Sequence, residues 1–303
     1  MNHFVRISGN DKNRRAFMQK TAEAALIFVF LLFCRSISAQ QWVCKPEDKA
    51  VFDQYIAYIT PYKTRPDAEV LEKTAAFFIG TPYVAHTLDL SETEQLTVNL
   101  RELDCFTYVE NVIALSQTAV SENPTFECFI ENLQNIRYRG GIVEDFSSRL
   151  HYASDWAFEN EKRGLLTDIS KKLGGLRETK PINFMSAHRS SYMQLKTDDA
   201  MLAKIKELEK RINDRGGFYY LPKEKIAVAA GKIPKMAVVG FATDIEGLDI
   251  THLGFVWRKN GRVGFIHASS KAMKVTIDTE SISSYCLSRK SCTGVMLTTV
   301  RLK

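Results

Sequence analysis

The 303-residue sequence has no basic run long enough to suggest nucleic-acid binding, no internal repeat and no low-complexity segment. Nucleic-acid binding needs a concentrated positive face, so the absence of a basic run argues against a nucleic-acid partner. Close ligand pairs of the Cys-x-x-Cys or His-x-x-x-His type are also missing. Their absence argues against structural zinc and leaves a catalytic metal without support, so no cofactor is expected.

A long apolar run is missing as well. The run at residues 24–34 has 11 residues, whereas a membrane-spanning helix needs about 20. It follows a basic stretch around Arg14 and Arg15 and precedes Ser36-Ile37-Ser38-Ala39, a pattern typical of an export signal over residues 1–39. A retained membrane anchor is the alternative for the same run.

The leader accounts for most of the net charge. It holds six of the 41 Lys and Arg residues and two of the 35 Asp and Glu residues, so the remaining chain has a net charge of +2 against +6 for the whole sequence. Both the general secretory and the twin-arginine routes fit the leader. Phe33 before Cys34 argues against lipidation, because lipoprotein signals have a small residue there. We expect an exported protein of the periplasm or cell envelope with no membrane span after signal removal.

Five cysteines follow the leader. In an oxidising compartment an odd number leaves at least one thiol outside the disulfides, and Cys105 is the candidate for the free one. Cys286 and Cys292 are near enough in sequence to close a small loop, and Cys44 with Cys128 would complete the pairing. Spacing alone leaves the connectivity open.

Apolar periodicity predicts an α+β fold, with a helix pair before an antiparallel sheet that ends the chain, in one catalytic domain over residues 40–303. Helices are predicted over 45–60, 65–79, 106–120, 126–138, 152–162 and 198–213. Strands are predicted over 94–100, 236–243, 252–258, 263–268, 274–277 and 294–302. The sequence Asn260-Gly261 predicts a tight hairpin turn. Residues 121–235 are interpreted as a largely helical and loop insertion.

Asp104 and Cys105 stand where an extended segment turns into a helix. Asp104 is suited to cap that helix by accepting a bond from a free amide of its first turn. The free amides and the positive end of the helix lower a thiol's pKa, whereas the charge of Asp104 opposes this, so an imidazolium partner is needed. A buried, unreactive cysteine on an amphipathic helix is the alternative.

Two histidines follow this cysteine at hairpin spacing. Alternation places His252, Gly254 and Val256 on one strand face, and His267 comes 15 residues after His252, beyond the Asn260-Gly261 turn. Antiparallel strands joined there would hold the imidazoles side by side, with one orienting the other. A lone histidine on a strand is typically a hydrogen-bonded polar residue. A helix-start cysteine followed by two such histidines instead predicts a nucleophile, a base and an orienting group.

These residues resemble the NlpC-type cell-wall cysteine hydrolases, papain-like enzymes that cut amide bonds in peptidoglycan. The matching motifs, in the family's order, are Phe78-Ile79-Gly80-Thr81-Pro82-Tyr83, Asp104-Cys105, His252-Leu253-Gly254 and Ile266-His267-Ala268-Ser269. The stretches Leu103-Asp104-Cys105-Phe106-Thr107 and 147–156 are most similar to the N-acetylmuramoyl-L-alanine amidase-like branch. Many relatives have Ser-Gly after Asp-Cys where this chain has Phe106-Thr107. The substrate of the common endopeptidases therefore cannot be assigned to this chain.

The resemblance implies a papain-like core in which the helix bearing the nucleophile packs on an antiparallel sheet. Cys105 would attack an amide carbonyl, His252 would take the thiol proton and later protonate the leaving amine, and His267 would hold the His252 ring in a productive tautomer. The backbone amide of Cys105 and the hydroxyl of Tyr83 would stabilise the oxyanion. The 121–235 insertion would shape the substrate pocket. Its candidate contacts are Arg149, Tyr152, Asp155 and Trp156.

The bond implied joins the lactyl group of muramic acid to L-Ala of the stem peptide, in anhydro-muropeptide fragments used in cell-wall recycling. An endopeptidase that cuts between D-Glu and the diamino acid is one alternative. A cysteine acyltransferase is another, because an amine captures the same thioester that water hydrolyses. A non-catalytic wall-binding protein is the third, and it predicts an unreactive Cys105.

Overall fold

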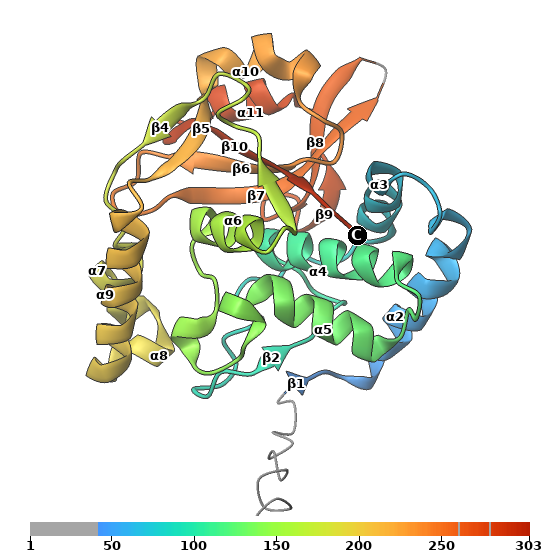
Figure 1. The fold of residues 1–303 in the computed structure, drawn as a ribbon, viewed down its shortest axis with the longest axis horizontal. Coiled ribbons are helices and arrows are strands. Elements are labelled where there is room, and N and C mark those ends of the chain that lie inside the picture. The colour runs from blue at the N-terminus through green and yellow to red at the C-terminus, as the bar shows by residue number, and fades with distance from the viewer. Residues whose placement is uncertain (1–41, 260, 279) are drawn as a thin grey trace, which may run out of the picture. The chain divides into compact units, whose positions relative to one another are not determined.

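Residues 42–259, 261–278 and 280–303 are described by the structure, a computed structural model of the chain. The export signal predicted over residues 1–39 lies outside these ranges. The described chain mixes helices and strands, with most helices early in the sequence and an eight-stranded sheet formed largely by its last third (Figure 1). Within these ranges, no helix combines the length and the apolar composition that crossing a membrane requires.

One helix, α4 (Cys105–Val120), is buried in the first half of the described chain. The other helices before residue 138 are α2 (Pro46–Ile59), the short 3₁₀ helix η1 (Thr60–Tyr62), α3 (Asp67–Phe77) and α5 (Phe126–Arg137). Every α4 residue from Thr107 to Ala119 is buried, as expected for a helix that is covered on all sides. The hydroxyl of Tyr55 joins α2 to its neighbours through Thr74 Oγ1 at 2.9 Å and the Leu115 carbonyl at 3.1 Å.

The predicted strand over 94–100 is almost entirely loop. Only β2 (Leu96–Thr97) is extended, and it pairs in parallel with β1 (Trp42–Val43). Leu96, Val98 and Leu100 are nevertheless buried. The alternation in this segment therefore reports burial of every second side chain, and only Leu96 and Thr97 belong to a sheet, the two-stranded one with β1.

The five strands predicted after residue 235 are all present. They are β6 (Val238–Thr243), β7 (Ile250–Lys259), β8 (Arg262–Ser269), β9 (Lys274–Ile277) and β10 (Cys292–Val300), and α11 (Ile282–Leu287) precedes the last of them. The ladder between β7 and β8 runs to the pair Lys259 and Arg262, so two residues join the strands. Gly261 has φ +77°, the left-handed conformation that such a turn requires.

The segment 121–235 contains strands that the sequence interpretation omitted. Its elements after α5 are η2 (Arg139–Gly141), η3 (Phe146–Ser148), α6 (Ala153–Lys162), β3 (Leu166–Asp168), β4 (Leu176–Glu178), α7 (Phe184–Ala187), η4 (Arg189–Ser191), α8 (Met193–Lys196), α9 (Asp199–Asp214), β5 (Phe218–Pro222), α10 (Lys223–Ala229) and η5 (Ala230–Lys232). Strands β3 and β5 both pair with β10, and β4 pairs with β5. Strands of three to five residues are too short for a clear period-two pattern.

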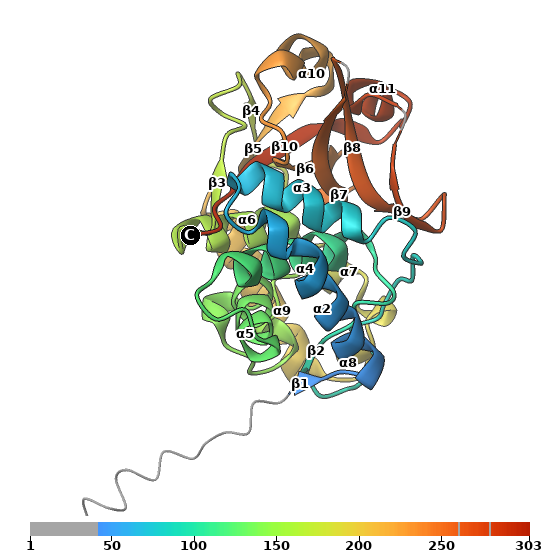
Figure 2. The same cartoon turned by 90° about the vertical axis from the view of Figure 1, so that its right-hand side faces the viewer.

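The two faces of the sheet pack against different helices. Leu253 and Phe255 of β7 lie in the larger core with α4, whereas Val256 of β7 and Phe265 of β8 lie in a second core with α10 and α11. Figure 2 shows α10 and α11 on one side of the sheet and α3, α4 and α6 on the other. The predicted alternation along β7 is therefore confirmed.

Cys286 and Cys292 form a disulfide that joins α11 to β10, so this predicted pair is confirmed. The predicted Cys44–Cys128 pair is wrong, because both thiols are free, as is that of Cys105. The sulfur of Cys128 instead lies 3.6 Å from the hydroxyl of Ser121. Cys105 is therefore one of three free thiols among the described residues. An odd number of cysteines does not single it out, so any argument for its reactivity must come from its surroundings.

Candidate active site

Cys105 is the first residue of α4, and Asp104 caps that helix. The Asp104 carboxylate accepts hydrogen bonds from the backbone amides of Phe106 at 3.0 Å and Thr107 at 2.8 Å. The amide of Asp104 donates in return to Thr107 Oγ1 at 2.9 Å. This reciprocal cap confirms the predicted helix start and fixes the backbone that presents the thiol.

His252 and His267 are in direct contact across β7 and β8. Nε2 of His252 lies 2.6 Å from Nδ1 of His267, and the two rings are nearly perpendicular, at 84°. The register pairs Phe255 with Ile266, which places His267 opposite Gly254. A Cβ on Gly254 would lie 3.0 Å from the Cβ of His267. A side chain at position 254 would therefore crowd the His267 side chain, and glycine avoids this contact.

The thiol of Cys105 lies against β7 at the residue that follows His252. Its sulfur is within hydrogen-bonding reach of the backbone of Leu253, the residue after His252. His267 contacts Nε2 of His252 and so leaves Nδ1 of that ring available for another partner. Burial and the charges of Cys105 and Asp104 raise the pKa of the Tyr83 hydroxyl, which places this hydroxyl near the thiol too. The structure therefore shows the predicted contact of His252 with His267 and places Cys105 against Leu253 and near Tyr83, while the approach of His252 to the thiol stays a prediction.

Burial determines the charge state of these groups. It raises the pKa of the Cys105 thiol to about 12, with Asp104 adding to the rise and nearby backbone amides opposing it. Burial lowers the pKa of His252 to about 3, helped by His267, and lowers that of His267 to about 4. The helix start and Asp104 thus act on the thiol pKa in the predicted directions, and desolvation, which the sequence argument did not include, is the largest effect. At neutral pH the resting pair is a thiol and an uncharged imidazole.

Arg149 and Tyr152, which were predicted to bind substrate, are turned into the fold. The guanidinium of Arg149 bonds to Asp89 at 2.7 Å and lies 3.4 Å from a Glu94 oxygen. The hydroxyl of Tyr152 donates to Glu209 at 2.8 Å. Both side chains already have strong partners, so their contact with a substrate stays a prediction.

Asp155 and Trp156 are also buried. Asp155 accepts hydrogen bonds from Arg139 and from Arg215, the latter at 2.6 Å. The ring of Trp156 packs edge-on against Phe106, with their centroids 5.7 Å apart. Trp156 thus supports the residue that follows the nucleophile, and the substrate-binding role of this pair likewise stays a prediction.

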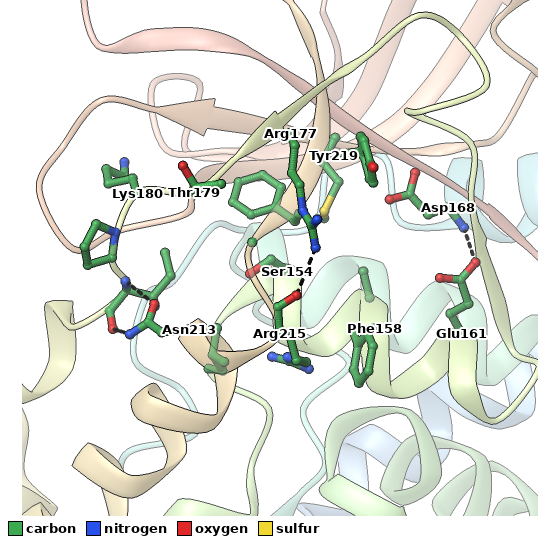
Figure 3. A pocket seen from close by; sticks show the side chains of 17 residues that line it. Ser154, Phe158, Glu161, Asp168, Arg177, Thr179, Lys180, Asn213, Arg215 and Tyr219 are labelled. Carbon is green, nitrogen blue, oxygen red and sulfur yellow. Dashed lines mark hydrogen bonds between the residues drawn. The ribbon is translucent and has the colours of Figure 1, made fainter.

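A cavity of about 380 Å³ lies between α6, α9 and the strands β4 and β5, lined almost entirely by residues of the predicted insertion (Figure 3). Arg177 points to the backbone of Arg215 and donates to its carbonyl at 3.0 Å. Lys180 donates to the carbonyl of Ile245 at 2.9 Å. The acceptors of these two bonds are uncharged, and the cavity lining also holds the carboxyl groups of Glu161 and Asp168. Phe158 and Tyr219 supply aromatic surface.

The cavity and Leu253, whose backbone contacts the thiol of Cys105, are separated by two strand spacings in the sheet. Met296, which lines it, pairs with Gly240, and Gly240 pairs with Leu253. Two strand spacings are about 10 Å, so the cavity begins about that distance from the residue whose backbone contacts the thiol. Sequence analysis missed Arg177 and Lys180, because lone cations in a segment without regular periodicity give no signal of a pocket.

No group of three or more His, Cys, Asp or Glu side chains in the described part of the chain is arranged to hold a metal ion. The arrangement at Cys105 needs none, because a thiol, a neutral imidazole and hydrogen-bond donors suffice for nucleophilic attack on an amide.

Comparison with known proteins gives one family and several solved structures. Residues 73–295 match the model of the AmiA-like family, described as N-acetylmuramoyl-L-alanine amidase-like. An N-acetylmuramoyl-L-alanine amidase from Bacteroides uniformis is 30% identical with a TM-score of 0.71, over 76% of this chain and 98% of that one. None of the curated proteins matches the chain.

Two further structures are similar. A Bacteroides fragilis protein proposed to be a xylanase is 33% identical with a TM-score of 0.70, over 74% of this chain and 98% of that one. A Legionella pneumophila protein is 25% identical with a TM-score of 0.62, over 83% of this chain and 96% of that one.

Proposed function

The chain belongs to the N-acetylmuramoyl-L-alanine amidase-like family, and on that basis we propose that it is a cysteine amidase that hydrolyses the bond between the lactyl group of muramic acid and L-Ala. The observations that support this most are the contact of His252 with His267 and the capped helix start that presents Cys105 against the backbone of Leu253. The packing of α4 on β7 and β8 also supports an NlpC-type, papain-like core for this chain.

In the proposed mechanism the sulfur of Cys105 attacks the lactyl carbonyl while its proton passes to Nδ1 of His252. The carbonyl oxygen becomes an oxyanion that the Cys105 amide and the Tyr83 hydroxyl stabilise. The carbon–nitrogen bond then breaks, and His252 gives its proton to the leaving amine of L-Ala. Water, deprotonated by His252, attacks the thioester, and the carbon–sulfur bond breaks to release the acid and restore the thiol.

We assign the cavity at Arg177 to the stem peptide. A stem peptide carries several carboxylates, which suit the basic side chains of Arg177 and Lys180 in the cavity lining. An extended chain spans about 3.5 Å per residue, so about three residues cover the roughly 10 Å between the cavity and Leu253. The cavity supports the proposal that residues 121–235 shape the substrate pocket.

We also propose that the protein acts outside the cytoplasm, in the periplasm or cell envelope, on anhydro-muropeptide fragments. The Cys286–Cys292 disulfide supports this location, because such bonds persist in oxidising compartments.

Digestion of one defined anhydro-muropeptide, followed by mass spectrometry, tests the function. Free intact stem peptide is the expected product, and Cys105→Ala should abolish it. Cys128→Ala is the matched control, because Cys128 is another half-buried free thiol and its loss should leave the product unchanged. Hydrolysis that survives in Cys105→Ala would contradict the mechanism.

The same digest separates the alternatives. Cleavage after D-Glu would identify an endopeptidase, a new amide with an added amine acceptor would identify an acyltransferase, and no product at all would favour a wall-binding protein. A substrate whose stem carboxylates are amidated tests the cavity: KM should rise with little change in kcat, whereas an unchanged KM would contradict its assignment.

A further inference from the structure

The buried ring of His267 has one nitrogen, Nε2, to which the proposed mechanism assigns no function. Its Nδ1 faces His252, whereas its Nε2 is buried without a hydrogen-bond partner in the described structure. Oδ2 of Asp278 lies 3.6 Å from that Nε2. This distance exceeds that of a hydrogen bond but leaves a carboxylate facing a buried ring nitrogen.

Proton counting shows why this nitrogen matters. A neutral imidazole has one donor and one acceptor nitrogen. His252 can accept the thiol proton at Nδ1 only if its own proton is on Nε2, where it donates to Nδ1 of His267. His267 must then have its proton on Nε2, directed toward Asp278. The opposite tautomer of His267 would place a proton on Nδ1 of His252 and block the base.

We propose that Asp278 is a positioning residue for the hydrolysis, because its carboxylate selects the His267 tautomer that leaves Nδ1 of His252 free to accept the proton of Cys105. The inference rests on the proposed function for the identity of the reaction. Its geometry involves only residues of this chain. Asp278 acts through two imidazoles and does not contact the substrate.

The backbone holds Asp278 in this place. Its amide donates to the Phe265 carbonyl at 2.9 Å, two residues before His267 on β8. Its other carboxylate oxygen, Oδ1, accepts from the Glu280 amide at 2.8 Å. With Oδ1 occupied in this way, Oδ2 is the oxygen that faces the ring.

Other groups around the histidine pair do not supply this function. The guanidinium of Arg289 lies over the Tyr285 ring and disfavours a charged imidazole in both histidines. Tyr285 contributes its ring face, with centroids 6.1 Å and 6.2 Å from those of His252 and His267. Among Asp278, Tyr285 and Arg289, only the carboxylate of Asp278 accepts hydrogen bonds without donating them. The proton on Nε2 of His267 requires such an acceptor.

Nitrogen-15 NMR of the intact protein with labelled histidine tests the proposal directly. The wild-type protein should show His267 protonated on Nε2. In Asp278→Asn the amide can donate to Nε2, so the proton should move to Nδ1. A wild-type His267 protonated on Nδ1, or an unchanged tautomer in Asp278→Asn, would overturn the proposal whatever the substrate is.

Reactivity gives a second measurement that needs no muropeptide. Iodoacetamide labelling of Cys105, resolved by peptide mass spectrometry, should slow in Asp278→Asn, because the base that removes the thiol proton is blocked. On the proposed substrate, kcat should fall on the order of 10²-fold or more with little change in KM, as for a carboxylate that orients a catalytic histidine. Labelling at the wild-type rate would overturn the proposal.

Glu280→Gln is the matched control, because Glu280 is exposed on the same loop and lies 3.9 Å from Arg289. It should leave both the tautomer and the labelling rate unchanged. Asp278→Glu should restore part of the labelling rate by returning a carboxylate. If Asp278→Asn fails to fold, the wild-type tautomer and the Asp278→Glu rate still decide the question.

Discussion

At the scale of single residues, Cys105 is subject to two opposing effects. The amides at the start of α4 favour a thiolate, whereas burial and the Asp104 carboxylate favour the neutral thiol. The second effect is larger, because removing a charge from water costs more than the partial charges of a helix start return. In the proposed mechanism the thiolate therefore forms during the attack, when His252 takes the proton, and is not stored as an ion pair.

Asp104→Asn separates the two functions of the capping side chain. The amide oxygen still accepts the bonds of Phe106 and Thr107, while the negative charge beside the thiol is lost. We expect the pKa of Cys105 to fall and its labelling by iodoacetamide at pH 8 to become several-fold faster. An unchanged rate would show that Asp104 does not set the charge state of the thiol.

Asp104→Ala is the comparison, because it removes the cap together with the charge. The free energy of unfolding should fall by about 1 kcal/mol in urea denaturation, the usual contribution of an N-cap residue. Asp104→Asn should lose only a small part of it.

At the scale of elements, the β7–β8 hairpin determines how His252, the proposed base, is placed relative to His267. The hairpin register places His267 opposite Gly254, and the bare backbone of Gly254 admits the imidazole. Hairpin spacing predicted that the histidines would be neighbours. It did not predict their 2.6 Å contact, which depends on a glycine two residues along the strand.

Gly254→Ala tests this dependence. The added Cβ would lie 2.9 Å from the Ile266 carbonyl oxygen and 3.0 Å from the Cβ of His267, so the strands or the ring must move. We expect a loss of about 1–3 kcal/mol in the free energy of unfolding, typical of overpacking, together with a large fall in kcat. Gly231→Ala is the matched control, because a Cβ there meets no atom within 4 Å. Full activity in Gly254→Ala would contradict this account of the hairpin.

The segment 121–235 shows where element prediction failed. Its helices α5, α6 and α9 were predicted within a residue or two at their ends, because their apolar residues recur at helical spacing. Its strands β3 and β5 were missed, because they are stabilised by pairing with β10, more than 70 residues later. Such pairing leaves little trace in a short local sequence.

At the scale of the whole molecule, three imidazoles link stability to acid. Burial lowers the pKa of His151 to about 3, that of His252 to about 3 and that of His267 to about 4. In the unfolded chain these groups take up protons near their ordinary pKa of 6.5, whereas the folded protein takes them up only near pH 3 to 4. Their contribution to stability is therefore complete above pH 6.5 and is lost progressively as the pH falls to about 3.

His151→Gln isolates part of this effect. Buried carboxyls with a raised pKa, such as those of Glu94 and Asp249, oppose the trend, so the comparison is between variant and wild type. Urea unfolding between pH 7 and pH 4 should show a shallower loss of stability in the variant, by at most about 1.4 kcal/mol per pH unit. His86→Gln, at an exposed position, should leave the slope unchanged. Equal slopes for His151→Gln and the wild type would contradict the assignment.

The sequence by itself determined the local features of this protein. The cap at Asp104, the hairpin turn at Gly261 and the alternation along β7 each depend on neighbouring residues, and together they predicted Cys105, His252 and His267. Tertiary structure decided the rest: the neutral state of the thiol, the free Cys44 and Cys128, the cavity at Arg177 and the approach of Asp278 to His267. These depend on burial and on contacts between distant segments, because desolvation and long-range packing exist only once the chain has folded.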